Sequence, residues 1–360
     1  MDTSLPARVR QAIEKSGLTQ ADFATKVRLT PDKLSKSLNG TRRFTTLDLA
    51  LIAETAGTTV DWLLTGREPE RPAMAARASA DHATATIESI AERFHRADQQ
   101  LQQLRGSREL TPVPLELDAS GLAKWATGRL AERSLTVQAL STPDLINALD
   151  TAFDVDTVVE RFPGGLDGFA WQTSTLRLIG AGMTLYWARQ RFTIAHELGH
   201  ILLRHAHDLV AENVGQHGKH PHEKAADKFA AEFLMPETVL RAAAPTGHLV
   251  RAEAIRLVNL LQVSPVALSW RARNLGLISP SEQRELAALT AETCSILGRR
   301  PELAHQAGTD SAARRFPRRI VVGHLNAYQE GETSARPLAD LLSVPVEQII
   351  ESFAAGGQSH

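Results

Sequence analysis

The chain contains the pentapeptide His196-Glu197-Leu198-Gly199-His200 within a run of apolar residues. Residues four apart lie on one face of an α-helix, so a helix at this position would turn both imidazoles toward the same point. Apolar side chains on both sides of the motif predict that this helix is buried and rigid: Phe192, Ile194, Leu198, Ile201 and Leu202. The fold must therefore bring any further metal ligand to the histidine face of a buried helix.

A second helix is expected to supply that ligand. A catalytic zinc ion takes three protein ligands and keeps one position open. Glu223 and Asp227 are four residues apart and so share a helix face. We predict that Zn²⁺ is bound by His196, His200 and Glu223, and that Asp227 accepts a hydrogen bond from the outer nitrogen of a ligand imidazole. Small residues would let the two helices pack closely: Ala225, Ala226 and Ala230.

Other histidines lie between or beside these two helices, and they leave alternatives open. They are His205, His207, His217, His220 and His222. A solvated polar loop is the simpler interpretation of this group. His222 is the one competing ligand, because it adjoins Glu223. A surface helix with a chance pair of histidines and ordinary core packing is the alternative to the whole metal site.

The predicted chemistry is hydrolysis of a peptide bond. Zinc polarises a carbonyl group and lowers the pKa of its bound water toward neutrality. Glu197 lies beside the two histidines, where its carboxylate can take a proton from that water and pass it to the leaving nitrogen. The sequence therefore predicts a zinc endopeptidase with Glu197 as its catalytic base.

The N-terminal part of the chain predicts a DNA-binding unit. Residues 1–43 contain nine basic and four acidic side chains, a balance of +5, whereas the whole chain has a net charge of -1. Two short helices, expected over 19–27 and 30–38, are joined by two residues, which is the spacing of a helix-turn-helix that inserts its second helix into the major groove. The predicted contacts to double-stranded DNA are Gln20, Thr30, Asp32, Lys33, Ser35, Lys36, Arg42 and Arg43.

This prediction has one alternative and one corollary. A small helical interaction domain with an incidental basic face would show the same pattern. A single helix-turn-helix usually binds DNA weakly, so a homodimer on a two-fold operator is expected.

The rest of the chain divides into three further segments. Residues 67–109 are predicted to form a linker and a helix with a sparse apolar stripe, which would serve as a spacer or as a dimerising helix. Residues 110–280 combine helices with a strand-rich section over 156–186. Residues 281–360 are expected to be a helical extension of unknown role.

Composition limits the compartment. Cys294 is the single cysteine, so no disulfide framework is available. No secretory signal segment and no apolar run of about 20 residues is present. We therefore expect a cytoplasmic protein with no membrane partner.

Two families resemble parts of the chain. Residues 5–66 resemble the Xre/Cro-CI type of helix-turn-helix, through Leu18-Thr19-Gln20, Leu38-Asn39-Gly40 and the segment 60–66. Residues from about 120 to 280 are similar to the ImmA/IrrE metallopeptidase family. The matching pieces are the pentapeptide 196–200 and the segment from Glu223-Lys224-Ala225-Ala226-Asp227 to Leu234-Met235-Pro236.

The resemblance implies a multidomain, mainly α fold. An all-α helix-turn-helix bundle over 1–66 would be followed, within 110–280, by an α+β zincin-like metallopeptidase domain with a small antiparallel sheet. Family members are bacterial or phage regulators that cleave a partner repressor, often one with an Xre domain, and so switch on stress or mobile-element genes. The family commonly has Asn where this chain has Asp227, which keeps a hydrogen-bond acceptor.

Three functions are compatible with these observations. The first is a regulatory endopeptidase that cleaves a partner repressor or itself. The second is a transcription factor whose zinc domain is a sensor without significant proteolysis. The third is an antitoxin-like regulator that uses the peptidase domain as an interaction surface. The endopeptidase needs Glu197 as a base, and the other two do not.

Overall fold

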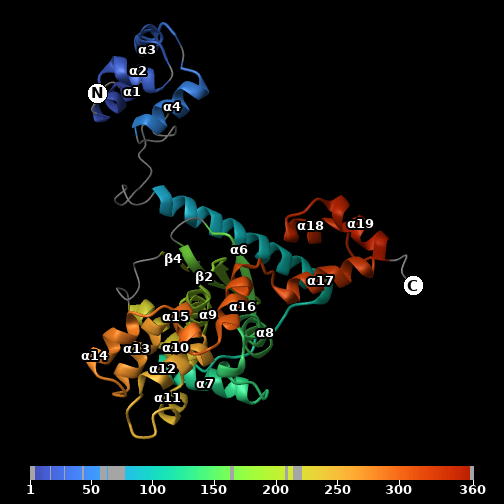
Figure 1. Ribbon diagram of the computed structural model, residues 1–360. Coiled ribbons are helices and arrows are strands. Elements are labelled where there is room, and N and C mark those ends of the chain that lie inside the picture. Colours follow the sequence, from blue (N-terminus) through green and yellow to red (C-terminus); the bar gives the residue numbers. More distant parts are fainter. Residues whose placement is uncertain are drawn as a thin grey trace. The chain divides into compact units, whose positions relative to one another are not determined.

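The computed structural model describes residues 5–16, 18–27, 29–42, 44–56, 63, 78–162, 166–206, 210–213 and 221–356. The chain divides into two compact units, Met1–Arg77 and Ala78–His360, which Figure 1 shows. Several predicted features lie outside the described residues. They are Arg43, the segment 60–66 apart from Leu63, most of the linker, and the histidines at 207, 217 and 220.

The first unit is a bundle of helices α1 (Leu5–Lys15), α2 (Gln20–Lys26), α3 (Pro31–Leu38) and α4 (Thr46–Ala56). Thr19 and Thr30 cap α2 and α3, and each side chain accepts a hydrogen bond from a backbone amide of the first turn. Gly40 follows α3 with φ of 75°, a left-handed conformation that favours glycine. The bundle closes around a buried apolar cluster that includes Phe23, Leu34 and Ile52. The predicted all-α unit is confirmed.

The second unit combines many helices with one sheet. Its helices are α6 (Ala78–Arg105), α7 (Ala119–Ala131), η1 (Val137–Ala139), α8 (Thr142–Phe153), α9 (Trp187–Leu202), α10 (Pro221–Leu234), α11 (Glu237–Ala242), α12 (Arg251–Leu261), α13 (Pro265–Asn274), α14 (Pro280–Ala287), α15 (Ala291–Leu297), α16 (Pro301–Ala312), α17 (Arg318–Gln329), α18 (Arg336–Leu342) and α19 (Val346–Gly356). Its strands are β1 (Val155–Glu160), β2 (Leu166–Gln172), β3 (Arg177–Gly182) and β4 (Val210–Asn213). The predicted mainly helical architecture with a small sheet is confirmed.

The sheet is mixed, which corrects the expectation of an antiparallel sheet. Its strand order is β1-β3-β2-β4. Strands β2 and β3 form a hairpin, and β2 also pairs antiparallel with β4. Strand β3 lies between β2 and β1, and its pairing with β1 is parallel.

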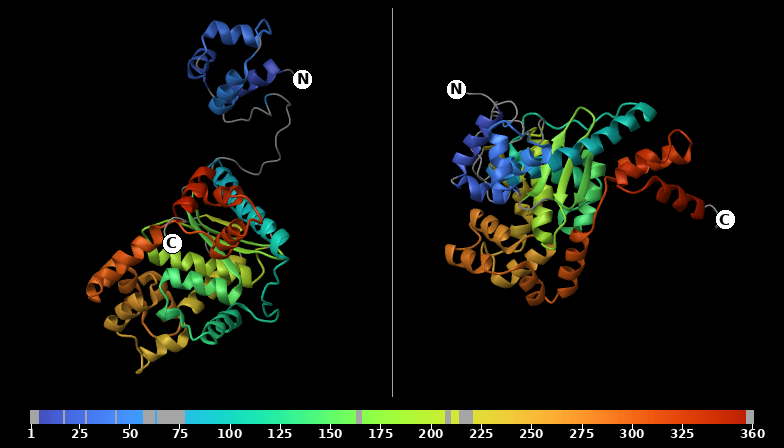
Figure 2. Two further views of the ribbon diagram at one scale, coloured as in Figure 1. Left: turned by 90° about the vertical axis from the view of Figure 1, so that its right-hand side faces the viewer. Right: turned by 90° about the horizontal axis from the view of Figure 1, so that it is seen from above.

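Helices cover both faces of the sheet. Alternate residues of a strand point to opposite faces. Phe169 and Leu178 pack with α6, whereas the next residues in sequence, Ala170 and Ile179, pack with α9. Figure 2 shows α6 lying along the sheet. The helix expected as a spacer or as a dimerising helix is thus part of the second unit, and its apolar stripe is a buried packing face.

The C-terminal extension contacts the edge of the sheet. Val159 of β1 and Arg315 exchange two backbone hydrogen bonds of 2.9 Å each, which form an isolated bridge at the outer edge of β1. Helix α16 packs on α9, and Gln190 of α9 donates to the Ser311 carbonyl at 2.8 Å. Helix α17 packs along α6 (Figure 1). The segment of unknown role is therefore an integral structural part of the second unit.

Buried carboxylates tie this extension to β1 and α6. The side chains of Asp98 and Asp156 are fully buried, and Arg319 of α17 contacts both, at 2.6 and 2.5 Å. Arg108 lies 3.3 Å from the Asp156 carboxylate. On the same strand, buried Glu160 pairs with Arg93 and Arg314. Burial raises the pKa of Asp156 to about 6, against the opposing effects of Arg319 and Arg108.

Removing the shared cation should destabilise the second unit. Arg319→Met would leave two buried carboxylates without Arg319, and breaking a buried pair typically costs about 3–5 kcal/mol. The raised pKa of Asp156 means that its protonated form favours the folded state. Its contribution is full below about pH 4, the pKa of an unfolded aspartate, and is lost as the pH rises through about 6. The variant should therefore lose less stability at pH 5 than at pH 8.

Urea unfolding followed by circular dichroism at both pH values measures this difference. Arg105→Met is the matched control, because Arg105 pairs with the exposed carboxylates of Glu330 and Glu332. Exposed pairs contribute about 0–1 kcal/mol. Equal losses in the two variants would contradict a structural role for the buried network.

Candidate metal centre

Helix α9 places three polar side chains of the motif in the core of the second unit. His196, Glu197 and His200 are each no more than 1% exposed. Helix α9 packs on β2 and β3 on one side and against α10 on another. Buried ionisable groups are normally paired or coordinate a metal, because losing their hydration is costly. The motif is therefore not an ordinary exposed helix with a chance pair of histidines.

Glu223 of α10 meets both histidines. The two Nε2 atoms of His196 and His200 are 3.0 Å apart. Glu223 Oε2 lies 3.4 Å from His196 Nε2, and Oε1 lies 3.6 Å from His200 Nε2. Among the described residues, these three side chains form the group whose ligand atoms converge within 4.8 Å. The structure thus brings together the three predicted ligands.

The separations fit a zinc ion. In a tetrahedral site with bonds of about 2.0–2.2 Å, neighbouring ligand atoms lie roughly 3.3–3.6 Å apart. The measured separations of 3.0, 3.4 and 3.6 Å are close to that range. Two imidazoles and one carboxylate are also a donor set that zinc prefers, and three ligands leave one position open.

A close helix contact holds Glu223 in reach. Gly199 of α9 faces α10, and a Cβ atom at this position would lie 3.1 Å from Phe229 Cδ1 and 3.2 Å from Ala226 Cα. Glycine and alanine therefore let the two helix backbones approach. Ala226, one of the three small residues predicted on α10, lies at this contact, while the contribution of Gly199 was not predicted from the sequence.

Asp227 lies behind the first histidine. Its Oδ1 atom is 2.9 Å from His196 Nδ1. In this contact the imidazole N–H donates to the carboxylate, which leaves Nε2 with its lone pair toward Glu223 and His200. The geometry is that of a carboxylate that orients a metal-binding histidine.

Glu197 packs against Gly168 of β2, a residue with no role predicted from the sequence. A Cβ atom at Gly168 of β2 would lie 2.8 Å from Glu197 Oε1 and 2.5 Å from Thr193 Cγ2. The pairing of β2 with β4 shifts register between Leu166 and Gly168. A glycine inside a strand is a known sign of a bulge or a close approach, and that signal was available in the sequence.

His222, the competing ligand, is placed elsewhere. Its ring stacks on that of His205, with centroids 3.9 Å apart and an interplanar angle of 14°. It does not belong to the converging group of ligand atoms found among the described residues.

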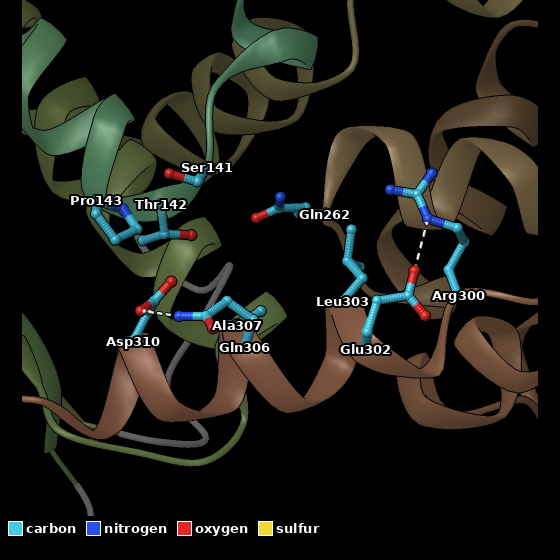
Figure 3. Close-up of a pocket in the computed structure, with 10 residues that line it drawn as sticks. All are labelled: Ser141, Thr142, Pro143, Gln262, Arg300, Glu302, Leu303, Gln306, Ala307 and Asp310. Atoms are coloured by element: carbon cyan, nitrogen blue, oxygen red, sulfur yellow. Dashed lines mark hydrogen bonds and ion pairs between the residues drawn. The ribbon is translucent and has the colours of Figure 1, made fainter.

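A pocket of about 180 Å³ lies apart from this centre. It is bounded by the start of α8, by Gln262 and by α16, as Figure 3 shows. Two of its polar pairs are internally satisfied: Gln306 donates to Asp310 at 2.8 Å, and Arg300 donates to Glu302 at 3.1 Å. None of the predicted site residues lines it.

Most of the predicted DNA contacts lie on the surface of α2 and α3. Gln20, Thr30, Asp32, Lys33 and Lys36 are exposed, and Ser35 is half-buried. Asp32 and Lys36 form an exposed ion pair of 2.8 Å along α3. This pairing removes part of the positive charge of α3 and leaves Lys33 as its other exposed cation.

Arg42, a predicted phosphate contact, forms an ion pair that was not predicted. Its guanidinium pairs with the largely buried Asp48 at 2.8 Å and donates to Ser37 Oγ at 2.9 Å. It therefore ties the loop after α3 to α4, because a mostly buried carboxylate attracts the nearest cation. Arg43 is outside the described residues.

Two parts of the chain match family models, and these matches support a DNA-binding regulator with a peptidase-family domain. Residues 9–63 match a helix-turn-helix family model. Residues 168–273 match the M78 peptidase family model, which describes an IrrE N-terminal-like domain. The two matches support an Xre-type helix-turn-helix followed by an ImmA/IrrE-like domain, so both predicted resemblances are confirmed.

No curated protein sequence matches the chain. None of the described helices is both long enough and apolar enough to cross a membrane.

The α9–α10 contact can be tested with one methyl group. Gly199→Ala would press on Ala226 and Phe229, and overpacking a well-packed contact typically costs about 1–3 kcal/mol. Because α10 carries Glu223, the variant should also bind zinc more weakly. A competing chromogenic chelator measures the zinc dissociation constant, and thermal unfolding measures stability.

Gly128→Ala is the control. Gly128 lies within α7, and a Cβ atom there would meet nothing within 4 Å. Alanine at an open helical position gains up to about 1 kcal/mol, with no effect expected on zinc. Wild-type zinc affinity and stability in Gly199→Ala would show that the helices do not need their close approach.

Proposed function

We propose that the protein is a DNA-binding transcriptional regulator whose second unit is a zinc-dependent endopeptidase. The observation that carries this proposal is the convergence of His196, His200 and Glu223 beside the buried Glu197. In this function the first three side chains hold Zn²⁺ and Glu197 is the catalytic base. Asp227 orients His196 through its hydrogen bond.

Each residue has a defined task in peptide hydrolysis. Zinc bound by the three ligands supplies the Lewis acidity that polarises a peptide carbonyl and acidifies water. Glu197 accepts the proton of the attacking water and returns it to the leaving nitrogen, so that one C–N bond breaks as one C–O bond forms. The burial of Glu197 favours this role, because removing solvent strengthens its interaction with a nearby proton donor.

The substrate proposed is a repressor with an Xre-type domain, or the protein itself. The helix-turn-helix of the chain supports this assignment, because two regulators that bind the same operator region are brought close together on the DNA. Double-stranded DNA is the proposed partner of the exposed face of α2 and α3, with a homodimer on a two-fold operator.

Glu197→Gln should abolish cleavage while zinc binding is kept. Glutamine has nearly the same shape as glutamate but does not accept a proton at neutral pH, and loss of a general base typically lowers the rate by about 10²–10⁴-fold. Wild type and variant are loaded with zinc and incubated with Xre-type repressors from the same genome. Mass spectrometry then identifies new fragments, including those of the protein itself.

The outcomes separate the candidate functions. Cleavage by wild type alone supports the endopeptidase. If both proteins hold one zinc ion and neither cuts, the regulator without significant proteolysis takes precedence, either as a zinc sensor or as an antitoxin-like interaction surface. If neither protein binds zinc, the proposed metal site is wrong.

Lys33→Ala should weaken DNA binding for all sequences alike. Lys33 is exposed on α3, and loss of one phosphate contact reduces the salt dependence of binding by about one unit. Fluorescence anisotropy with duplex DNA at several salt concentrations measures the slope. Lys124→Ala removes an exposed charge from α7 as the control. Equal slopes in wild type and Lys33→Ala would show that Lys33 contacts no phosphate.

A further inference from the structure

Helix α9 ends in a turn that sends the chain back toward the metal centre. After Leu203, Arg204 adopts a left-handed conformation with φ of 61°. The amide of His205 donates to the His200 carbonyl at 2.8 Å, and the amide of Arg204 donates to the Ile201 carbonyl at 3.1 Å. Glycine usually occupies such a position, because a side chain there is strained. Arg204 is held in place by its bond to the Val113 carbonyl at 2.6 Å.

The turn brings the ring of His205 to the outer side of a metal ligand. His205 Nδ1 lies 3.3 Å from His200 Nδ1, and the two ring centroids are 5.4 Å apart. The ring of His222 stacks on the ring of His205. His222 directly precedes Glu223, so the stack joins the end of α9 to the start of α10.

We propose that His205 is a positioning residue for His200, and that His222 holds His205 in place. This inference rests on the metal site of the proposed function. For His200 to offer the Nε2 lone pair to a metal, its proton must be on Nδ1. That N–H then donates to His205 Nδ1, which acts as the acceptor and carries its own proton on Nε2.

The two ligand imidazoles are therefore oriented by different acceptors. His196 donates to the carboxylate of Asp227 at 2.9 Å, whereas His200 faces the neutral ring of His205 at 3.3 Å. Outer hydrogen bonds of this kind fix the ring orientation and strengthen the ligand.

A role of His205 and His222 as a second metal-binding pair does not fit the geometry. Ring lone pairs lie in the plane of each imidazole, and the two planes are nearly parallel at a centroid separation of 3.9 Å. Lone pairs in parallel planes do not converge on one ion. The stack instead packs the His205 ring against the flat face of the His222 ring.

Zinc affinity of the full chain tests the proposal. His205→Leu removes the acceptor and should weaken zinc binding by about 10–100-fold, the usual effect of losing such a partner. His205→Asn keeps a polar atom near the place of Nδ1 and should bind zinc more tightly than the leucine variant. His222→Phe keeps a stacking ring and should bind more tightly than His222→Ala. A cobalt(II)-loaded sample provides a second readout, because its visible absorption reports the ligand geometry.

His248→Leu is the matched control, because His248 is an exposed histidine that pairs with Glu282 at 2.8 Å. Thermal unfolding of the metal-free variants verifies that each one folds. Recovery in His205→Asn but not in His205→Leu supports a positioning role, since leucine fills the space at least as well. Wild-type zinc affinity and an unchanged cobalt spectrum in His205→Leu would overturn it. If the wild type itself fails to bind zinc, the proposed function fails first, and the two failures are thereby distinguished.

Discussion

The close approach of α9 and α10 determines the geometry of the candidate site. Two of the ligands lie on α9 and the third on α10, so their separation depends on how near the two backbones come. Gly199 and Ala226 set that distance, because neither has a side chain long enough to separate the helices. Asp227, one turn after Glu223, uses the same contact to reach His196. The α9–α10 pair thus provides both the close backbone packing and the convergence of the three candidate ligands.

The sheet fixes the other side of α9. Gly168 of β2 lets the strand backbone come close to Glu197, so this side chain, the proposed base, is set against the sheet rather than a loop. On the opposite face of the sheet, α6 and α17 bury Phe169 and Leu178 and surround the carboxylate of Asp156. The metal centre is therefore supported by segments that are far from it in sequence.

The features predictable from the sequence are those with a local signature. The helical spacing of His196, His200, Glu223 and Asp227 predicted which side chains meet, because helix periodicity is independent of the rest of the fold. The parallel pairing of β1 with β3 and the packing of α6 depend on contacts between distant segments, and no local pattern encodes them. Arg42 shows the same limit: its basic character was visible, but its pairing with Asp48 was not.

The ion pairs of the C-terminal extension also have a consequence for the order of folding. Asp156 and its partner Arg319 are separated by 163 positions along the chain. At a synthesis rate of about 5–20 residues per second, roughly 8–30 seconds pass between the appearance of the carboxylate and that of its cation. During that interval the outer edge of β1 lacks its bridge to Arg315, and α6 lacks its packing against α17. Until Arg319 is synthesised, the nascent second unit consequently keeps the Asp156 carboxylate without this cation and the outer edge of β1 exposed.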